Sequence, residues 1–281
     1  MPELPEVETV KEALNQTVKG QTIKEIELRY EPMIKNMSAD EFKEKLINQT
    51  IQEVSRRGKY LVFHFDDYQL LSHLRMEGKY FYVDSDFELN PHVHVIFTLE
   101  NGKRLLYQDT RKFGTYHLYD KAIDLETTAP FQVLGLEPFA TEFTPSYVKE
   151  KIQNKKKPIK SLLLDQTIVC GLGNIYVDEV LYRARLHPLT SSSELTDKDI
   201  ENVVKYTVEV LARAIELGGT TIRTFSSSHG VSGTFQNELL VHQRKGENCY
   251  ECHTPIEKIK VGGRGTYFCP TCQKLTVKEM K

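Results

Sequence analysis

Apolar residues recur at two different spacings along this chain. Over residues 2–19 they return every three to four positions, which predicts a helix, and Gly20 follows as its stop. Between about 51 and 119, the runs YLVFHF, QLLSHL, KYFYV, HVHVIFTL and KRLLYQD are short, β-rich and separated by Gly, Asn and Asp. This pattern predicts an antiparallel β-sandwich flanked by helices.

After LGLEPF at 134–139 the spacing of apolar residues becomes that of helices. Four segments there show a 3.6-residue period, and the last of them ends at the glycine pair 218–219. A Ser/Gly-rich stretch without strong periodicity follows, and the cysteines come after it. We therefore expect an α+β chain with three domains: a β-sandwich over 1–135, a helical domain over 136–235 and a small cysteine-rich module over 236–281.

Composition places the protein among ordinary globular chains. The 281 residues are 40% hydrophobic and 27% charged, and no run of about 18 apolar residues occurs, so no membrane span is expected. The start is acidic and has no apolar core of a signal peptide, which predicts a cytoplasmic protein. The net charge of -2 does not indicate a nucleic-acid partner, although SRRGK at 55–59 and NKKKPIK at 154–160 are basic. Either cluster is also compatible with a solvated surface.

Four cysteines form two pairs with metal-ligand spacing. Cys249 and Cys252 are separated by two residues, as are Cys269 and Cys272, and sixteen residues lie between the pairs. This spacing predicts a four-cysteine zinc ribbon, in which the metal supplies the folding energy of a module too small for its own core. Two disulfides are the alternative, and a cytoplasmic location disfavours them. For Cys170, beside an apolar run, we expect a buried and inert thiol.

Three motifs together resemble one family. The start PELPEVET, the internal GLGNIYVDE and the terminal VGGRGTYFCPTCQ are similar to those of bacterial formamidopyrimidine-DNA glycosylases, in the same order and over almost the whole chain. The related endonuclease VIII branch typically begins PEGPE, whereas Leu4 stands at that glycine here. The resemblance implies a monomeric base-excision-repair enzyme that acts on double-stranded DNA containing oxidised bases. It removes oxidised purines (8-oxoguanine and formamidopyrimidines), and it has a helix–two-turn–helix domain and one structural zinc ion.

The same resemblance makes Pro2 the nucleophile once Met1 is removed. A terminal amine has a reference pKa near 8, so roughly a quarter of it is neutral at pH 7.5, against on the order of 0.1% for an unperturbed lysine. Pro2 can attack C1′ and form an iminium, which supports strand cleavage by β,δ-elimination. Glu3 is implied as general acid/base, although a carboxylate at a helix start also complements the macrodipole. Lys59 matches a lysine that assists elimination and is otherwise a surface lysine.

The family positions that hold DNA fall on several loops. Met76 would fill the gap left by the everted base, Arg111 would bind the orphaned cytosine, and Phe113 would stack on a neighbouring pair. A place in the core is the ordinary alternative for Met76 and Phe113, but flanking charges favour loop tips. The positions expected to contact the backbone are His92, Lys160, Asn174 and Arg264, and Arg264 is also the candidate acid for the second elimination.

The loop around 220–236 corresponds to the family segment that closes over an everted 8-oxoguanine. Glu77, Thr110 and the loop sequence at 226–233 depart from the family pattern, as does VHQR at 241–244, and they leave the lesion preference open. Two other functions are considered. One is a non-catalytic, zinc-containing protein that binds damaged DNA, which would need none of Pro2, Glu3 and Lys59. The other is an endonuclease VIII-like glycosylase for oxidised pyrimidines.

Overall fold

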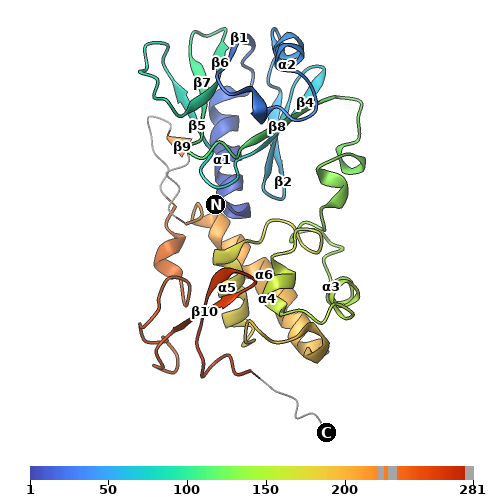
Figure 1. Ribbon diagram of the computed structural model, residues 1–281, viewed down its shortest axis with the longest axis vertical. Helices are drawn as coiled ribbons and strands as arrows, with labels where there is room; N and C mark the ends of the chain where they lie inside the picture. Colours follow the sequence, from blue (N-terminus) through green and yellow to red (C-terminus); the bar gives the residue numbers. More distant parts are fainter. Residues whose placement is uncertain (221–224, 227–232, 276–281) are drawn as a thin grey trace. The chain divides into compact units, whose positions relative to one another are not determined.

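The computed structural model describes residues 1–220, 225–226 and 233–275 (Figure 1). The chain packs into two compact units. Unit 1 comprises Met1–Gln132 with Gly218–Gly233, and unit 2 comprises Val133–Leu217 with Thr234–Lys281.

The described residues of unit 1 form a β-sandwich with two α-helices. Its helices and strands are α1 (Leu4–Val18), β1 (Ile23–Leu28), η1 (Glu31–Met33), α2 (Ala39–Leu46), β2 (Glu53–Arg57), β3 (Tyr60–His64), β4 (Tyr68–His73), β5 (Lys79–Val83), β6 (Val93–Leu99), β7 (Arg104–Gln108), β8 (Thr115–Asp120), η2 (Leu125–Thr127) and β9 (Phe225–Ser226), where η marks a short 3-10 helix. One sheet has the order β1-β6-β7-β5-β9 and the other β2-β3-β4-β8. All pairs are antiparallel except β5 with β9.

The two sheets and the two helices of unit 1 share one core. Apolar residues from α1, α2 and both sheets form a single buried cluster that includes Leu14, Phe42, Leu61 and Phe97. The helix predicted over 2–19 is α1, and Gly20 follows it at φ +79°, a conformation that suits glycine. Strand β1 lies outside the region where the sequence pattern predicts strands, and its residues IKEIEL interleave apolar and charged side chains.

Asn15 fixes α1 to the edge of the second sheet. Its amide nitrogen donates to the carbonyl of Val54 (2.7 Å), and its amide oxygen accepts the N–H of Val54 (2.8 Å). Arg56 on the same strand donates to the carboxylate of Glu8 on α1 (2.7 Å). Strand β2 is therefore held to α1 through side chains as well as through apolar packing.

Unit 2 combines four helices with a two-stranded hairpin among its described residues. Its elements are α3 (Pro145–Ile152), α4 (Ile159–Leu163), α5 (Asn174–Arg183), η4 (Ser192–Glu194), α6 (Asp197–Glu216), η5 (Phe235–Glu238), β10 (Glu257–Val261) and β11 (Arg264–Phe268), and η3 (Phe131–Val133) lies where the two units join along the chain. Helix α5 is central, because it packs against α4, α6 and β11. These four helices correspond to the four helical segments that the sequence predicts.

A buried carboxylate ties the chain before the hairpin to α5. Glu179 has no exposed surface, and its side chain accepts the N–H groups of Leu240, Val241 and His242 at 3.0 Å. Burial raises the pKa of Glu179 above its usual value, against the effect of these backbone hydrogen bonds. The helical segment and the cysteine-rich end thus pack as one compact unit, and the division of the chain into three domains stays a prediction.

Candidate active site and zinc centre

Two glutamates organise the start of α1. Pro2 and Glu3 are buried, with Glu3 only 2% exposed, whereas Met1 is exposed. Glu3 is the N-cap residue, and the carboxylate of Glu6 accepts its N–H at 2.8 Å, as in a capping box. The predicted nucleophile and its neighbouring acid therefore occupy a sheltered helix start, where unsatisfied N–H groups favour negative charge.

Glu6 also binds the segment that follows the last long helix. Its second carboxylate oxygen accepts the N–H of Thr220 (2.8 Å) and the Thr220 hydroxyl (3.1 Å). Gly219 has φ +77°, a conformation that favours glycine, and a Cβ there would lie 2.6 Å from the same oxygen. The start of the predicted lesion loop is thus fixed to α1. Most of that loop, 221–224 and 227–232, lies outside the described residues.

Lys59 lies in the tight turn between β2 and β3 and is largely buried. Gly58 precedes it at φ +58°, and Arg56 donates to the Gly58 carbonyl at 3.0 Å. Because Arg56 also binds Glu8, the turn is held against α1. Burial raises the pKa of Glu8, and hydrogen bonds from Lys11 and Arg56 outweigh this, leaving it below the usual value. In Figure 1 the start of α1 and the end of β2 lie at the same end of unit 1.

The three residues predicted to fill the gap in the DNA are on exposed loops of unit 1. Met76, between β4 and β5, is 38% exposed, and Phe113, between β7 and β8, is 51% exposed. Arg111 is exposed and lies over the Phe113 ring, 4.7 Å from its centroid. His92 is exposed just before β6, and its carbonyl accepts the N–H of Asp109 at 2.9 Å. Neither Met76 nor Phe113 belongs to the core.

In unit 2 the structure brings three predicted residues to one turn and corrects one of them. Asn174 begins α5, and its side-chain nitrogen donates to the Gly265 carbonyl at 3.0 Å. Arg264 is exposed after the turn formed by the two glycines at 262–263. Lys160, however, has no exposed surface, so its side chain is not placed for direct contact with a phosphate. Its ammonium donates to Asp178 at 2.7 Å instead.

The partners of Lys160 were missed by our sequence analysis. Besides Asp178, the ammonium reaches the Thr266 hydroxyl (2.8 Å) and the Gly265 carbonyl (3.3 Å). The other oxygen of Asp178 is paired with the imidazole of His242 (2.8 Å) and accepts the N–H of Tyr267 (3.2 Å). Lys160 is thus bonded to the strand that carries Arg264. Only the long-range fold shows this, because Asp178 and Thr266 lie 18 and 106 residues away along the chain.

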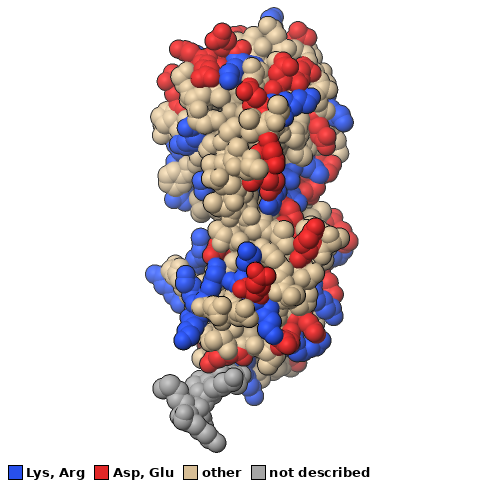
Figure 2. Space-filling view, turned by 90° about the vertical axis from the view of Figure 1, so that its right-hand side faces the viewer, with Lys and Arg blue, Asp and Glu red and all other residues tan. Residues whose placement is uncertain are grey.

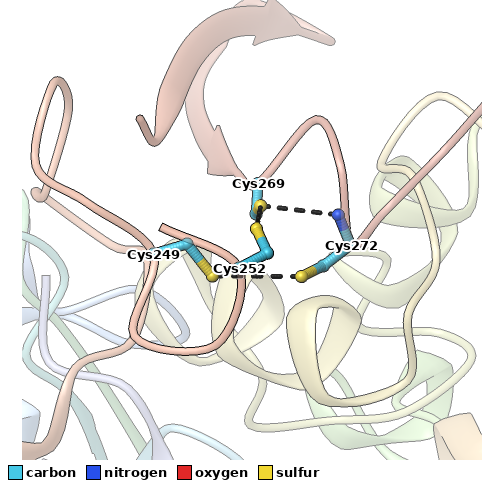
Figure 3. A group of neighbouring side chains, drawn as sticks. All are labelled: Cys249, Cys252, Cys269 and Cys272. Atoms are coloured by element: carbon cyan, nitrogen blue, oxygen red, sulfur yellow. Dashed lines mark hydrogen bonds between the residues drawn. The ribbon is translucent and has the colours of Figure 1, made fainter. Parts of the chain in front are cut away.

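The four paired cysteines converge on one point (Figure 3). Their sulfur atoms all lie within 4.8 Å of one another, with 3.3 Å between those of Cys252 and Cys269 and 3.9 Å between those of Cys249 and Cys272. Four sulfurs placed about 2.3 Å from one tetrahedral zinc ion are about 3.8 Å apart, so the cluster fits that ion. All five cysteines are free of disulfides, and Cys170 is buried as expected.

In the face seen in Figure 2, basic and acidic side chains are interspersed on both units. Among the helices that the structure describes, none combines the length and apolar character needed to cross a membrane.

Models of three domains of one protein family match successive parts of the chain. Models of the formamidopyrimidine-DNA glycosylase N-terminal domain and H2TH domain match residues 1–116 and 134–226. A model of the zinc finger found in the same enzymes and in IleRS matches residues 246–275, which contain the four-cysteine cluster. The chain therefore carries one structural zinc site made by these cysteines.

Named relatives and solved structures cover the chain almost completely. Formamidopyrimidine-DNA glycosylases of Bacillus licheniformis and Exiguobacterium sibiricum are 48% and 49% identical over 98% and 99% of this chain, and over 100% of each relative. A Lactococcus lactis FPG mutant in complex with Fapy-dG DNA has a TM-score of 0.91 at 43% identity, with 97% and 100% of the two chains covered. The L. lactis enzyme with abasic-site DNA gives 0.90 at 44% identity, over 97% and 99%. The chain belongs to the formamidopyrimidine-DNA glycosylase family.

Proposed function

We propose that this protein is a bifunctional base-excision-repair enzyme, a DNA glycosylase with AP lyase activity that removes oxidised purines from double-stranded DNA. One observation carries the proposal: Glu3 is buried beside Pro2 at the start of α1, and the turn that bears Lys59 is tied to the same helix. The relatives from L. lactis are complexes with DNA that contains Fapy-dG or an abasic site, which supports this substrate class.

The chemistry begins when removal of Met1 gives Pro2 a neutral secondary amine. Its lone pair forms a bond to C1′ of the damaged nucleotide, and the base leaves with the bonding electrons. The Pro2 nitrogen then gives its proton to Glu3, which passes it to the sugar oxygen as the ring opens, and this leaves an iminium between Pro2 and C1′. The iminium acidifies C2′, so loss of that proton expels the 3′ phosphate. A second elimination expels the 5′ phosphate, with Lys59 assisting the first and Arg264 as the proposed acid for the second.

DNA is held by the residues on the exposed loops. Met76 fills the space of the everted base, Arg111 binds the orphaned cytosine, and Phe113 stacks on a neighbouring pair. His92 and Asn174 contact the backbone, and the start of α5 supplies N–H groups that favour a phosphate. Lys160 acts by positioning the turn at Arg264.

The proposal extends to the oligomeric state, the domain roles, the cellular location and the zinc ion. We propose that the protein acts as a monomer, and that function divides into a catalytic domain over 1–135, a DNA-binding domain over 136–235 and a zinc module over 236–281. A cytoplasmic location with association to the nucleoid follows from action on bacterial DNA. Zinc has a structural role here, because four thiolates leave no open coordination position for water.

The test is covalent trapping. The protein is incubated with a duplex bearing 8-oxoguanine opposite cytosine in the presence of borohydride, which reduces an iminium to a stable amine, and the adduct is located by mass spectrometry. We expect a single adduct on the nitrogen of Pro2 in a chain that lacks Met1. Duplex without damage is the control for adventitious reduction.

Three other results separate the alternative functions. Tight binding of the damaged duplex with no adduct would identify a non-catalytic damage-binding protein. Adducts formed only with oxidised pyrimidines would indicate the endonuclease VIII-like activity. An adduct on Lys59 instead of Pro2 would retain the enzyme class and overturn the assignment of the nucleophile.

A further inference from the structure

One buried carboxylate shapes the whole loop between β7 and β8. Asp109 has no exposed surface, and its side chain accepts three backbone N–H groups, from Arg111 on one oxygen and from Phe113 and Gly114 on the other, each at 2.9 Å. Hydrogen bonds to an ionised acceptor are about twice as strong as neutral ones. The backbone that presents Arg111 and Phe113 is therefore fixed from inside the protein.

Asp109 is itself anchored on both sides. Its N–H donates to the His92 carbonyl at 2.9 Å, and its own carbonyl is 2.8 Å from Nε2 of His94 on β6. Between the bonded residues, Lys112 adopts φ +57°, which is uncommon for a residue with a side chain. The loop backbone is thus bonded at several points, and Arg111 and Phe113 are both exposed, with the guanidinium group over the ring.

Hydrogen bonds to backbone N–H groups also hold the loop that carries Met76. The N–H of Arg75, which has φ +53°, donates to Nδ1 of His73 at 2.9 Å. Burial, followed by the charges of Arg75 and Lys59, lowers the pKa of His73 to about 3, so that its imidazole remains a neutral acceptor. At the far end of the loop, the N–H of Gly78 donates to the Leu74 carbonyl at 2.9 Å.

A single buried tyrosine joins the two loops. A Cβ on Gly78 would lie 2.3 Å from the Tyr107 hydroxyl oxygen, and a Cβ on Gly114 would lie 1.8 Å from it. Tyr107 has no exposed surface. Its hydroxyl therefore occupies the space between the last residue of the Met76 loop and the last residue of the Arg111 loop, and both positions admit only glycine.

We propose that Asp109 is a positioning residue that holds Arg111 and Phe113 ready for the orphaned base before DNA binds, and that Tyr107 couples this loop to the Met76 loop. The inference rests on the proposed function, because it assigns the two loops to the opposite strand. Neither Asp109 nor Tyr107 is exposed, so each acts through the residues it holds and not by touching DNA.

The test compares two substrates for the same enzyme. The first is a single-stranded oligonucleotide with an aldehydic abasic site, whose cleavage needs Pro2, Glu3 and Lys59 but has no orphaned base. The second is a duplex with 8-oxoguanine opposite cytosine or adenine, followed under single-turnover conditions. The variants are Asp109→Ala, Asp109→Asn and, as a matched control, Asp66→Ala. Asp66 is exposed, and it also accepts a backbone N–H, from Thr50 at 3.0 Å.

We expect Asp109→Ala to excise 8-oxoguanine opposite cytosine about 10- to 100-fold more slowly, because misplacement by about 1 Å has an effect of this size. Its preference for cytosine over adenine should largely disappear, and its cleavage of the single strand should stay within about threefold of wild type. Asp109→Asn should be intermediate, since one amide oxygen replaces two acceptors. Asp66→Ala should match wild type on both substrates.

Other results would overturn the inference. If Asp109→Ala keeps both rate and base preference, Asp109 does not position the loop. If both Asp109 variants lose activity equally on the two substrates, the effect is general damage to the fold. The slowing caused by Met76→Ala and by Asp109→Ala should be less than multiplicative in the double variant, and multiplicative effects would show that the loops act separately. An inactive wild-type protein would instead overturn the proposed function, and this inference with it.

Discussion

Replacement of Lys160 by methionine tests how far unit 2 depends on one buried charge. The ammonium group donates to Asp178 at 2.7 Å and to Thr266 at 2.8 Å, and neither end of the Lys160–Asp178 pair has exposed surface. Methionine retains most of the apolar stem but removes the charge. The Asp178 carboxylate then remains buried with only its contacts to His242 and Tyr267.

The expected cost is large because the remaining carboxylate cannot reach water. Removal of one partner from a buried ion pair typically destabilises a protein by about 3–5 kcal/mol. For a unit of this size, about 4 kcal/mol corresponds to a fall in Tm of roughly 10 °C or more. Asp178→Asn in the Lys160→Met background replaces the unpaired charge by a neutral amide. The double variant should therefore be more stable than the sum of the single effects by at least about 1 kcal/mol.

The control is a lysine–aspartate pair on the surface of the same unit. Lys149 lies 2.6 Å from Asp197, but their side chains are 49% and 76% exposed. Such a pair contributes about 0–1 kcal/mol to stability, so the Tm of Lys149→Met should be close to that of the wild type. Calorimetry would measure Tm, and hydrogen exchange over 257–268 would report locally, because the N–H of Tyr267 is bound to Asp178.

One result would refute this reasoning. If Lys160→Met and Lys149→Met differ by less than about 1 kcal/mol, the charge at Asp178 is compensated without the lysine. The hairpin that carries Arg264 would then not depend on Lys160. If Lys160→Met shows faster hydrogen exchange in the hairpin but an unchanged Tm, loss of the lysine loosens the hairpin alone and not the whole unit.

Three further predictions concern other parts of the chain. The pKa of His73 is about 3 in the folded protein and 6.5 in the unfolded chain. The contribution of its neutral imidazole to the free energy of unfolding is therefore complete above pH 6.5 and is lost as the pH falls towards 3. Between pH 7.5 and pH 5 the free energy of unfolding of His73→Asn, measured with urea, should therefore fall by about 2 kcal/mol less than that of the wild type. Metal analysis should find one zinc per chain, and chelation should make the hairpin of unit 2 sensitive to protease while unit 1 stays folded. Gly219→Ala should slow excision at least about tenfold through its clash with Glu6, whereas Gly102→Ala, at a similar φ of +82° with open space around it, should not.

The sequence predicts those features that depend on local pattern. The helix at 2–19 and the five apolar runs all correspond to observed elements, because periodicity and turn residues act over a few positions. The zinc cluster follows from cysteine spacing. The exposure of Met76 and Phe113 follows from the charges beside them.

Contacts between distant segments are not visible in a single sequence. Lys160 resembles a surface lysine within a basic cluster, and only its partners on α5 and β11 show that it is buried. Asp109 looks like an ordinary turn residue, although an aspartate two residues before Arg111 is a known way to bind a turn backbone. The assignment of Glu3 as a catalytic group came from family resemblance, since a helix start explains a carboxylate equally well.

The pairing of Asn15 with Val54 has a consequence for self-association. Strand β2 is at the edge of its sheet, where unpaired N–H and C=O groups can recruit a strand from another molecule. The Asn15 amide satisfies both backbone groups of Val54, the second residue of β2, as a residue on a neighbouring strand would. A helix side chain thus closes this edge to a second copy, and Asn15→Ala should favour edge-to-edge aggregation before it alters the fold.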